Sequence, residues 1–276
     1  MNCQIASEHL DAWARTKLAD PITKQGVDAS HFKISGGIID ARVFLKNTTG
    51  YLNWDSGQVE FEKYIEADHT TVAACKEHIE YDRVVYDHFK MAGEILDVGG
   101  FVGTVREFLN DEDRYLSIDP FISALTKITP EGRAAYACLS KPLNFVCGVA
   151  EFLPVRSASF DWVHMRSMLD HVQVPDLALL EAHRVLGPDG KLLIGLYVDG
   201  GKSGTRPPIR ILKDEIKHVL SQLGIDRWKD HHVWHPTYKA LRKLIADNGF
   251  HIQDVFWQPH WNDTVCYLLA TKRETV

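Results

Sequence analysis

Hydrophobic positions in the second two-thirds of the chain form short runs that alternate with amphipathic segments. The runs with the length of buried strands are Glu94–Val98, Arg114–Asp119, Asn144–Cys147, Phe160–Met165 and Lys191–Tyr197. The segments Phe101–Asn110 and Asp176–Leu186 between them follow the spacing of helices. Regular alternation of strands and helices predicts a parallel sheet that is covered by helices on both faces.

The C-terminal part continues this pattern with a change of direction. We expect helices over Ile209–Leu223 and Thr237–Asn248, and the Asn248-Gly249 pair is a good stop for the second. The last two strands are predicted at Phe250–Trp257 and Thr264–Ala270. Because a short connection joins them, they should form an antiparallel hairpin at the edge of the sheet.

The N-terminal part has a weaker pattern. Residues 31–52 have a β-like pattern with a turn at Ser35-Gly36-Gly37, and residues 59–90 have a helical texture. We therefore divide the chain into an N-terminal segment and cap, residues 1–80, and a main domain, residues 81–276. The glycine-rich turn Gly187–Gly190 and the long loop Val198–Pro208 interrupt the main domain.

Composition fits a globular protein of ordinary type. Of 276 residues, 45% are hydrophobic and 25% are charged. No apolar run approaches the roughly 20 residues that cross a bilayer, and the N-terminus lacks the basic-then-apolar order of a secretory signal. We expect a cytoplasmic protein with no membrane partner.

Charge and cysteine content narrow the partners further. The net charge of −6 disfavours a broad nucleic-acid surface, which needs clustered basic residues. The cysteines form no Cys-x-x-Cys pair, so free thiols are expected rather than disulfides or a cysteine zinc site. They are Cys3, Cys75, Cys138, Cys147 and Cys266.

The main chemical signal is a glycine-rich turn where a strand gives way to a helix. It contains Asp97, Gly99, Gly100, Phe101 and Gly103. Glycines there let the backbone approach a ligand closely, and the N–H groups of a helix start are available for binding. By itself such a turn could bind a dinucleotide, bind S-adenosylmethionine, or only reverse the chain.

An acidic residue at the end of the next strand strengthens this signal. Asp119 lies 22 positions after Asp97 and precedes Pro120. A carboxylate in this place can accept hydrogen bonds from both hydroxyls of a ribose. The alternative is a solvated aspartate in an Asp-Pro turn.

Together these segments resemble the class I S-adenosylmethionine-dependent methyltransferases, in particular the bacterial small-molecule group. The resemblance runs from Tyr81 to Lys272, and its most specific part, Leu177–Leu193, is structural. In the first motif of the family, Phe101 stands where the middle glycine is expected, and Gly100 supplies flexibility one residue early. The resemblance implies an α/β fold: a doubly wound, mostly parallel seven-stranded sheet with an antiparallel last strand and a small N-terminal cap.

The resemblance also implies the residues that bind S-adenosylmethionine. Ribose and adenine contacts fall on Asp119 and on Gly148–Pro154, where Val149 replaces the usual aspartate; the methionine part falls on the backbone of residues 165–166. The implied set is Tyr81, Asp97, Gly99, Gly100, Phe101, Gly103, Asp119, Pro120, Val149, Ala150, Glu151, Met165 and Arg166.

The fold and the N-terminal part each have an alternative interpretation. A dinucleotide-dependent dehydrogenase shares the fold, but its Gly-x-Gly-x-x-Gly turn is not reproduced, because Phe101 replaces a glycine and Gly103 comes too early. The N-terminal segments 18–24 and 32–40 faintly resemble the zinc-ribbon-like module of some methyltransferases. The metal-binding cysteines are absent there, so this part is a metal-free remnant or an unrelated cap.

Histidines are the candidates for acceptor chemistry. His171 follows the fourth predicted strand, and we name it as a candidate general base, with a structural role as the alternative. His164 is expected to pack inside its strand. Residues 226–261 are rich in histidine and tryptophan. We interpret them as a polar-aromatic wall or an acceptor pocket and assign no metal, because His231, His232 and His235 lack a partnered acid.

The sequence thus predicts methyl transfer to an oxygen, nitrogen or carbon atom of a small metabolite. One alternative is a cofactor-binding homologue that does not methylate, suggested by Phe101 and Val149. Methylation of tRNA or protein is a third, disfavoured by the charge balance.

Overall fold

The computed structural model describes most of the chain. The described residues are 10–48, 50–52, 54–55, 57, 71–204, 216, 232–259 and 262–273. The predicted helix Ile209–Leu223, apart from Ile216, lies outside them, as do residues 58–70 of the helical stretch and the histidine and tryptophan residues at 228, 231, 260 and 261.

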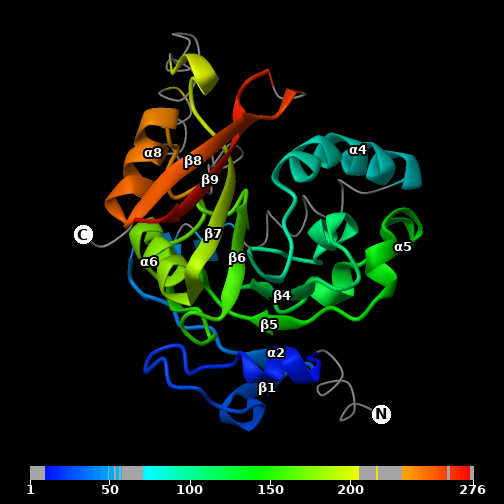
Figure 1. The fold of residues 1–276 in the computed structure, drawn as a ribbon. Coiled ribbons are helices and arrows are strands. Elements are labelled where there is room, and N and C mark those ends of the chain that lie inside the picture. The colour runs from blue at the N-terminus through cyan, green and yellow to red at the C-terminus, as the bar shows by residue number, and fades with distance from the viewer. Residues whose placement is uncertain are drawn as a thin grey trace.

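A mixed sheet forms the centre of the molecule (Figure 1). Its order is β1-β2-β5-β4-β3-β6-β7-β9-β8. The main strands are β3 (Glu94–Val98), β4 (Arg114–Asp119), β5 (Phe145–Cys147), β6 (Phe160–Arg166), β7 (Leu186–Tyr197), β8 (Phe250–Trp257) and β9 (Val265–Lys272). Strands β5, β4, β3, β6 and β7 run parallel, and β9 lies antiparallel to both β7 and β8. The predicted doubly wound fold and its antiparallel last strand are confirmed.

The β-like pattern predicted near the N-terminus forms a hairpin, which adds two strands to the seven predicted for the sheet. It consists of β1 (Lys33–Ser35) and β2 (Ile38–Asp40), joined by Gly36 and Gly37, which both have positive φ. Strand β2 pairs in parallel with β5 through Asp40 and Cys147. This pairing makes a 9-stranded sheet, so β1 and β2 continue the central sheet.

Helices cover both faces of the sheet. On one face lie α6 (Pro175–Val185) and α8 (Tyr238–Asp247); on the other lies α4 (Val72–Phe89), which contacts the short α5 (Pro130–Ala135) (Figure 1). The N-terminal α2 (Ala12–Thr16) packs into the first of these cores through Ala14. The 3₁₀ helices are η1 (Ala29–His31), η2 (Thr104–Phe108), η3 (Ala124–Lys127), η4 (Ala137–Ser140), η5 (Ala150–Phe152) and η6 (Gly201–Ser203).

The helix predicted over Phe101–Asn110 is wrong in type and length. The segment holds only η2, and it is preceded by two left-handed residues, Phe101 at φ 45° and Gly103 at φ 75°. A right-handed helix does not accommodate positive φ, so it begins only after Gly103. The residues predicted as a turn, Gly187–Gly190, lie inside β7, near the place where its register with β6 shifts.

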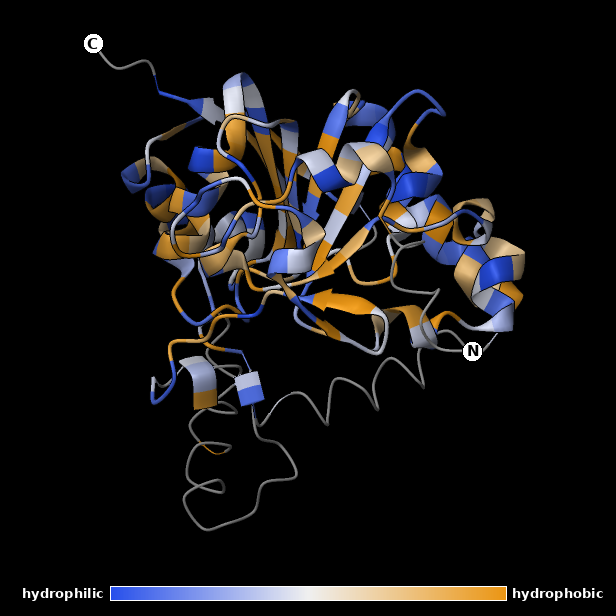
Figure 2. Ribbon diagram, turned by 90° about the horizontal axis from the view of Figure 1, so that it is seen from below, coloured by the Kyte–Doolittle hydropathy of each residue, from blue (hydrophilic) through white to orange (hydrophobic). Residues whose placement is uncertain are grey.

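Hydropathy follows the layers of the fold. Figure 2 shows hydrophobic colour along the central strands and more hydrophilic colour on the outer helices. Within the described part of the chain, no helix combines the length and the apolar character that crossing a membrane requires.

Candidate cofactor and acceptor site

The sheet reverses its winding direction beside β3. From β3 the chain proceeds through β4 and β5 on one side, and β6 and β7 then follow on the other. In doubly wound sheets, ligands bind outside the carboxyl ends of the strands at such a switch point. The segments at this place are the glycine turn after β3, Asp119 at the end of β4, and the residues after Arg166 of β6.

Glycine is required at the first position of the turn. Gly99 has a φ of 75°, and its N–H donates to the carbonyl oxygen of Ile118 at 2.8 Å. A Cβ at this position would lie 2.7 Å from the Cβ of Met168, which comes from the segment after β6. The turn closes through a hydrogen bond of 2.7 Å from the Gly103 N–H to the Gly100 carbonyl. The backbone therefore passes close to both neighbouring strands.

Asp119 points toward the glycine turn. Its carboxylate accepts hydrogen bonds from the backbone N–H groups of Phe101 at 3.0 Å and Phe121 at 2.9 Å. The residue is only 4% exposed, and burial raises the pKa of its carboxyl group to about 7. Its partners here are uncharged, so further donors such as ribose hydroxyls would stabilise the ionised form.

The Asp97 side chain packs directly against the glycine turn. Its Oδ1 lies 2.7 Å from Nδ1 of His164, and its Oδ2 accepts a hydrogen bond of 2.5 Å from the Tyr115 hydroxyl. A Cβ on Gly100 would lie 2.5 Å from Asp97 Oδ2, so the turn rests directly on this carboxylate. His164 is buried, as predicted, and its hydrogen bond makes it a support of Asp97.

The predicted adenine segment is buried and anchors a helix. Val149 and Ala150 lie at the start of η5 and are nearly inaccessible. Glu151 Oε1 accepts hydrogen bonds from the N–H groups of Gln173 at 2.5 Å and Val174 at 3.1 Å. The Glu151 carboxylate therefore holds the residues before α6, and burial raises its pKa.

The residue after Asp119 links the site to the N-terminal segment. The carbonyl oxygen of Pro120 accepts a hydrogen bond of 3.2 Å from the guanidinium of Arg42. Arg42 also forms a salt bridge with Asp40 at the end of β2. The N-terminal hairpin is thereby attached to the carboxyl end of β4.

Helix α4 contributes Asp82, a residue that the sequence analysis did not identify. The carboxylate of Asp82 forms a bidentate pair with the guanidinium of Arg166 at the end of β6, and one of the two bonds measures 2.6 Å. Tyr81 itself donates its hydroxyl to Glu77 within the helix, so its predicted role at the cofactor remains a prediction. Asp82 is a buried acid within an otherwise apolar helix face, which is the sequence signal that could have identified it. Met165 is fully buried in β6.

The predicted general base, His171, lies shortly after the end of β6. His171 is partly exposed, and its ring centroid lies 4.3 Å from that of His232. The segment that contains His232 is held against the residues after β6 by two hydrogen bonds. The Val233 N–H donates to the Asp170 carbonyl at 2.7 Å, and Trp234 Nε1 donates to the Leu169 carbonyl at 3.0 Å. The histidine-rich stretch thus lies against the residues that follow β6.

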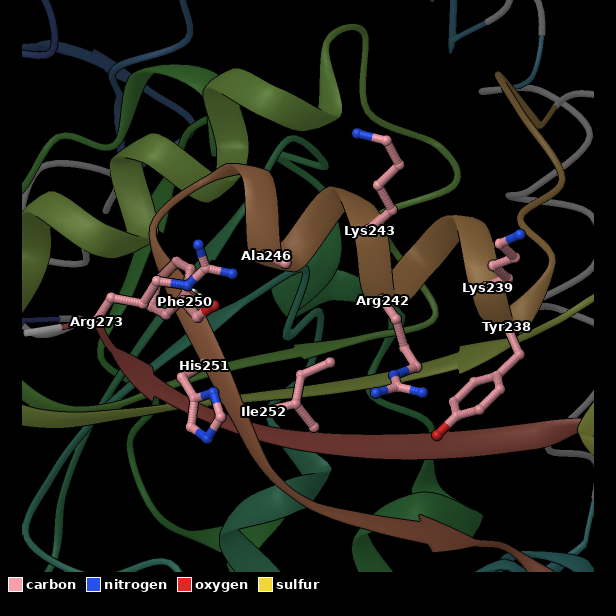
Figure 3. Close-up of a pocket in the computed structure, with 9 residues that line it drawn as sticks. All are labelled: Tyr238, Lys239, Arg242, Lys243, Ala246, Phe250, His251, Ile252 and Arg273. Atoms are coloured by element: carbon pink, nitrogen blue, oxygen red, sulfur yellow. Dashed lines mark hydrogen bonds between the residues drawn. The ribbon is translucent and has the colours of Figure 1, made fainter.

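A separate cavity of about 350 Å³ lies between α8 and β8. In Figure 3, Tyr238 and Arg242 point from α8 toward the strand, whereas Lys243 points to the other side of the helix. The other residues that line the cavity include Lys239, His251 and Arg273. None of its lining residues comes from the ends of β3, β4 or β6, so this cavity is separate from the residues at the switch point.

Comparison with known proteins agrees with this geometry. The family model described as "Methyltransferase domain" matches residues 96–194, which begin in β3 and end in β7. A curated malonyl-[acyl-carrier protein] O-methyltransferase of Geobacter sulfurreducens is 29% identical over 184 residues. That match covers 65% of this chain and 64% of the relative, so the matched part of the chain spans just under two thirds of the relative's length.

Solved structures show the same fold. A 1,6-didemethyltoxoflavin-N1-methyltransferase of Burkholderia thailandensis, solved with S-adenosylhomocysteine bound, superposes with a TM-score of 0.53 at 17% identity, covering 86% of this chain and 95% of that one. An S-adenosylmethionine-dependent methyltransferase of Thermotoga maritima gives a TM-score of 0.51 at 15% identity, covering 81% and 100%. At these identities the likeness concerns the fold.

Proposed function

We propose that the chain is an S-adenosylmethionine-dependent methyltransferase that moves a methyl group to an oxygen, nitrogen or carbon atom of a small metabolite. The methyltransferase family model that matches residues 96–194, the curated relative and the fold of the solved methyltransferases support this proposal. The observation that carries the proposal is the contact of Asp119 with the glycine turn at the switch point of the sheet. A carboxylate beside a close-approaching backbone suits a ribose attached to a purine. The buried Asp119 carboxylate, as an acceptor for ribose hydroxyls, and the adjacent glycine turn therefore support binding of the nucleoside part of the cofactor.

The residues of the site have distinct parts in this reaction. S-adenosylmethionine supplies a methyl group on a positively charged sulfur. Asp119, next to the glycine turn, would bind the ribose, and the Gly99–Gly103 backbone would allow the nucleoside to approach β3 closely. Most of the acceleration then comes from aligning the acceptor with the methyl group and excluding water.

His171 is proposed to take the proton of an acceptor that carries one at neutral pH. It lies after β6, three residues beyond Met168, whose side chain contacts the glycine turn. An imidazole in this place can act as a general base near pH 7. The curated relative is named for methylation of an oxygen, which supports oxygen as one acceptor atom.

Binding and transfer can be tested separately. Calorimetry with S-adenosylhomocysteine is expected to show one site per chain, and absence of binding at millimolar ligand would discard the proposal. Incubation with radiolabelled S-adenosylmethionine and fractionated host metabolites, followed by mass spectrometry, should then identify a labelled product. A malonyl-carrier protein is included as one acceptor, and bulk tRNA as a negative comparison.

A second candidate is a homologue that binds the cofactor without transferring its methyl group. Two observations favour it: Phe101, at the position where the middle glycine is expected, has a left-handed backbone, and Val149 replaces the usual aspartate of the adenine segment. Tight binding of S-adenosylhomocysteine without any labelled product would support this candidate over methyl transfer.

A further inference from the structure

Three side chains of types that can bind a metal ion lie close together after β6, with the proposed general base among them. Asp170, His171 and His232 each offer one ligand atom, and all these atoms lie within 4.8 Å of one another. His171 Nε2 is 3.9 Å from Asp170 Oδ1, and His232 Nε2 is 3.6 Å from Asp170 Oδ2. We propose that these residues bind a divalent transition-metal ion that holds the methyl acceptor.

The buried carboxylate of Asp170 is the independent observation. Asp170 is 7% exposed, and within the described ranges its Oδ1 is buried without a hydrogen-bond partner. A buried polar atom in this condition is destabilising unless a water molecule or an ion completes it. The same oxygen faces the imidazole of His171, so a cation between them would compensate the negative charge.

The spacing of the three side chains suits such an ion after a small movement. Two ligands about 2.1 Å from a tetrahedral zinc ion are ~3.4 Å apart. The observed distances of 3.6 and 3.9 Å exceed this by only a fraction of an ångström. Both imidazoles are partly exposed and can adjust, whereas the hydrogen bonds of Val233 and Trp234 to the 169–170 backbone keep the two segments together.

The kind of ion follows from the ligands. Two imidazoles and one carboxylate favour zinc, cobalt, nickel or iron(II) over magnesium or calcium, which prefer oxygen ligands. Three protein ligands leave coordination positions open for another molecule. From the sequence, the histidines alone lacked a partnered acid. The fold supplies one in Asp170, which is 62 positions away from His232.

The proposed role of the ion rests on the proposed methyl transfer. When the hydroxyl group of the acceptor binds the ion, the ion lowers the pKa of that hydroxyl, and the hydroxyl proton passes to solvent. The oxygen then forms a bond to the methyl carbon while the bond from carbon to sulfur breaks, and the sulfonium becomes a neutral thioether. In this role His171 orients the acceptor through the ion instead of taking its proton.

The test measures metal binding in the absence of cofactor and acceptor. Chelator-treated full-length protein is titrated with Co²⁺ and Zn²⁺ by calorimetry, and the Co²⁺ absorption bands are recorded. We expect one ion per chain, no comparable binding of Mg²⁺, and at least tenfold weaker binding in Asp170→Asn and in His232→Gln. The control is His88→Gln, a partly exposed histidine on α4 that pairs with Asp254.

The outcomes separate this inference from the proposed function. Absence of stoichiometric binding, or binding to folded Asp170→Asn and His232→Gln as tight as to the parent protein, overturns the metal site. Circular dichroism establishes that each variant is folded, and His232, at the surface, provides a second variant if Asp170→Asn does not fold. S-adenosylhomocysteine binding is measured on the same samples, because its failure would concern the methyltransferase proposal alone.

Discussion

The Asp119 carboxylate accepts a hydrogen bond of 3.0 Å from the backbone N–H of Phe101. This bond joins the end of β4 to the middle of the glycine turn. The group proposed to bind the ribose therefore also positions the backbone that the nucleoside approaches. Changes at either residue should alter cofactor binding, and they should do so by different physical routes.

Replacement of Asp119 by asparagine should weaken binding of S-adenosylhomocysteine by about 10- to 100-fold. Hydrogen bonds to a charged acceptor contribute about 1.5–3 kcal/mol, and asparagine keeps the shape while removing the charge. Calorimetry on the parent and the variant measures the change. Asp111→Asn is the control, because Asp111 is 90% exposed and pairs with Lys141 at the surface. Equal loss in both variants would remove the assigned role of Asp119.

Cofactor binding should also depend on pH. Because burial raises the pKa of Asp119 from 3.8 to about 7, its carboxyl group is protonated more readily in the folded chain than in the unfolded one. Its ionisation therefore lowers the free energy of unfolding as the pH rises through that window. The ribose hydroxyls need the ionised form, so binding should weaken by up to about tenfold per pH unit below the pKa.

The ligand for this measurement is methylthioadenosine, which has the ribose but lacks the amino acid part of the cofactor. Its affinity is compared between pH 8 and pH 6 for the parent protein and for Asp119→Asn. The variant should show a flat profile. A profile of the same slope in both proteins would assign the pH dependence to another group.

Phe101 should be better replaced by glycine than by alanine. Its φ of 45° lies in the left-handed region, where residues with a Cβ are strained by roughly 1–2 kcal/mol. Both variants lose the ring contact with Phe121, so their comparison isolates the backbone. We expect Phe101→Gly to exceed Phe101→Ala by about 1 kcal/mol in the free energy of unfolding, measured with urea. The opposite order would contradict a left-handed backbone at this position.

Local sequence signals predicted the strands well because each strand buries a short apolar run. The limits of β3, β4 and β8 agree with the predicted ranges, and those of α6 and α8 differ by one residue at each end. The helix after the glycine turn was not predicted correctly, because its start depends on the φ angles of Phe101 and Gly103. Those angles are set by the contacts of the turn with Asp119 and Met168.

The sequence predicted less well which residues of the site pair with one another. Asp97, Gly99 and Asp119 are brought together at adjacent strand ends, which the alternation of elements already implied. By contrast, Asp82 with Arg166 and Asp170 with His232 join segments that are far apart in the chain. Such pairings depend on how α4 and the segment after residue 231 dock on the sheet, and no local periodicity encodes that.

Removal of the charge of Asp82 should destabilise the fold by about 2 kcal/mol. The carboxylate is largely buried and binds both arms of Arg166, so Asp82→Asn leaves a poorly compensated guanidinium. The effect is kept below that of a fully buried pair because the Arg166 side chain is 33% exposed. Urea denaturation measures it, with Glu80→Gln as the control. Glu80 pairs with Arg83 at the surface, where such pairs contribute at most about 1 kcal/mol.

Two buried tyrosines should respond to loss of their hydroxyls in opposite directions. Tyr267 packs over Gly195, and among the described residues its hydroxyl has no hydrogen-bond partner. The hydroxyl of Tyr86 lies 3.3 Å from Nε2 of His164. Tyr267→Phe should therefore raise the free energy of unfolding by about 1 kcal/mol, and Tyr86→Phe should lower it by a similar amount.

Each substitution removes the same single atom from a fully buried ring, so the comparison cancels the common effect of a lost hydroxyl. The pKa of Tyr267 is raised to about 12 by burial, and the measurement at pH 7 therefore concerns the neutral form. Urea denaturation of the three proteins is sufficient. If Tyr267→Phe instead lowers stability, its hydroxyl must bind a water molecule in the parent protein, next to the Arg166 charge that already interacts with it.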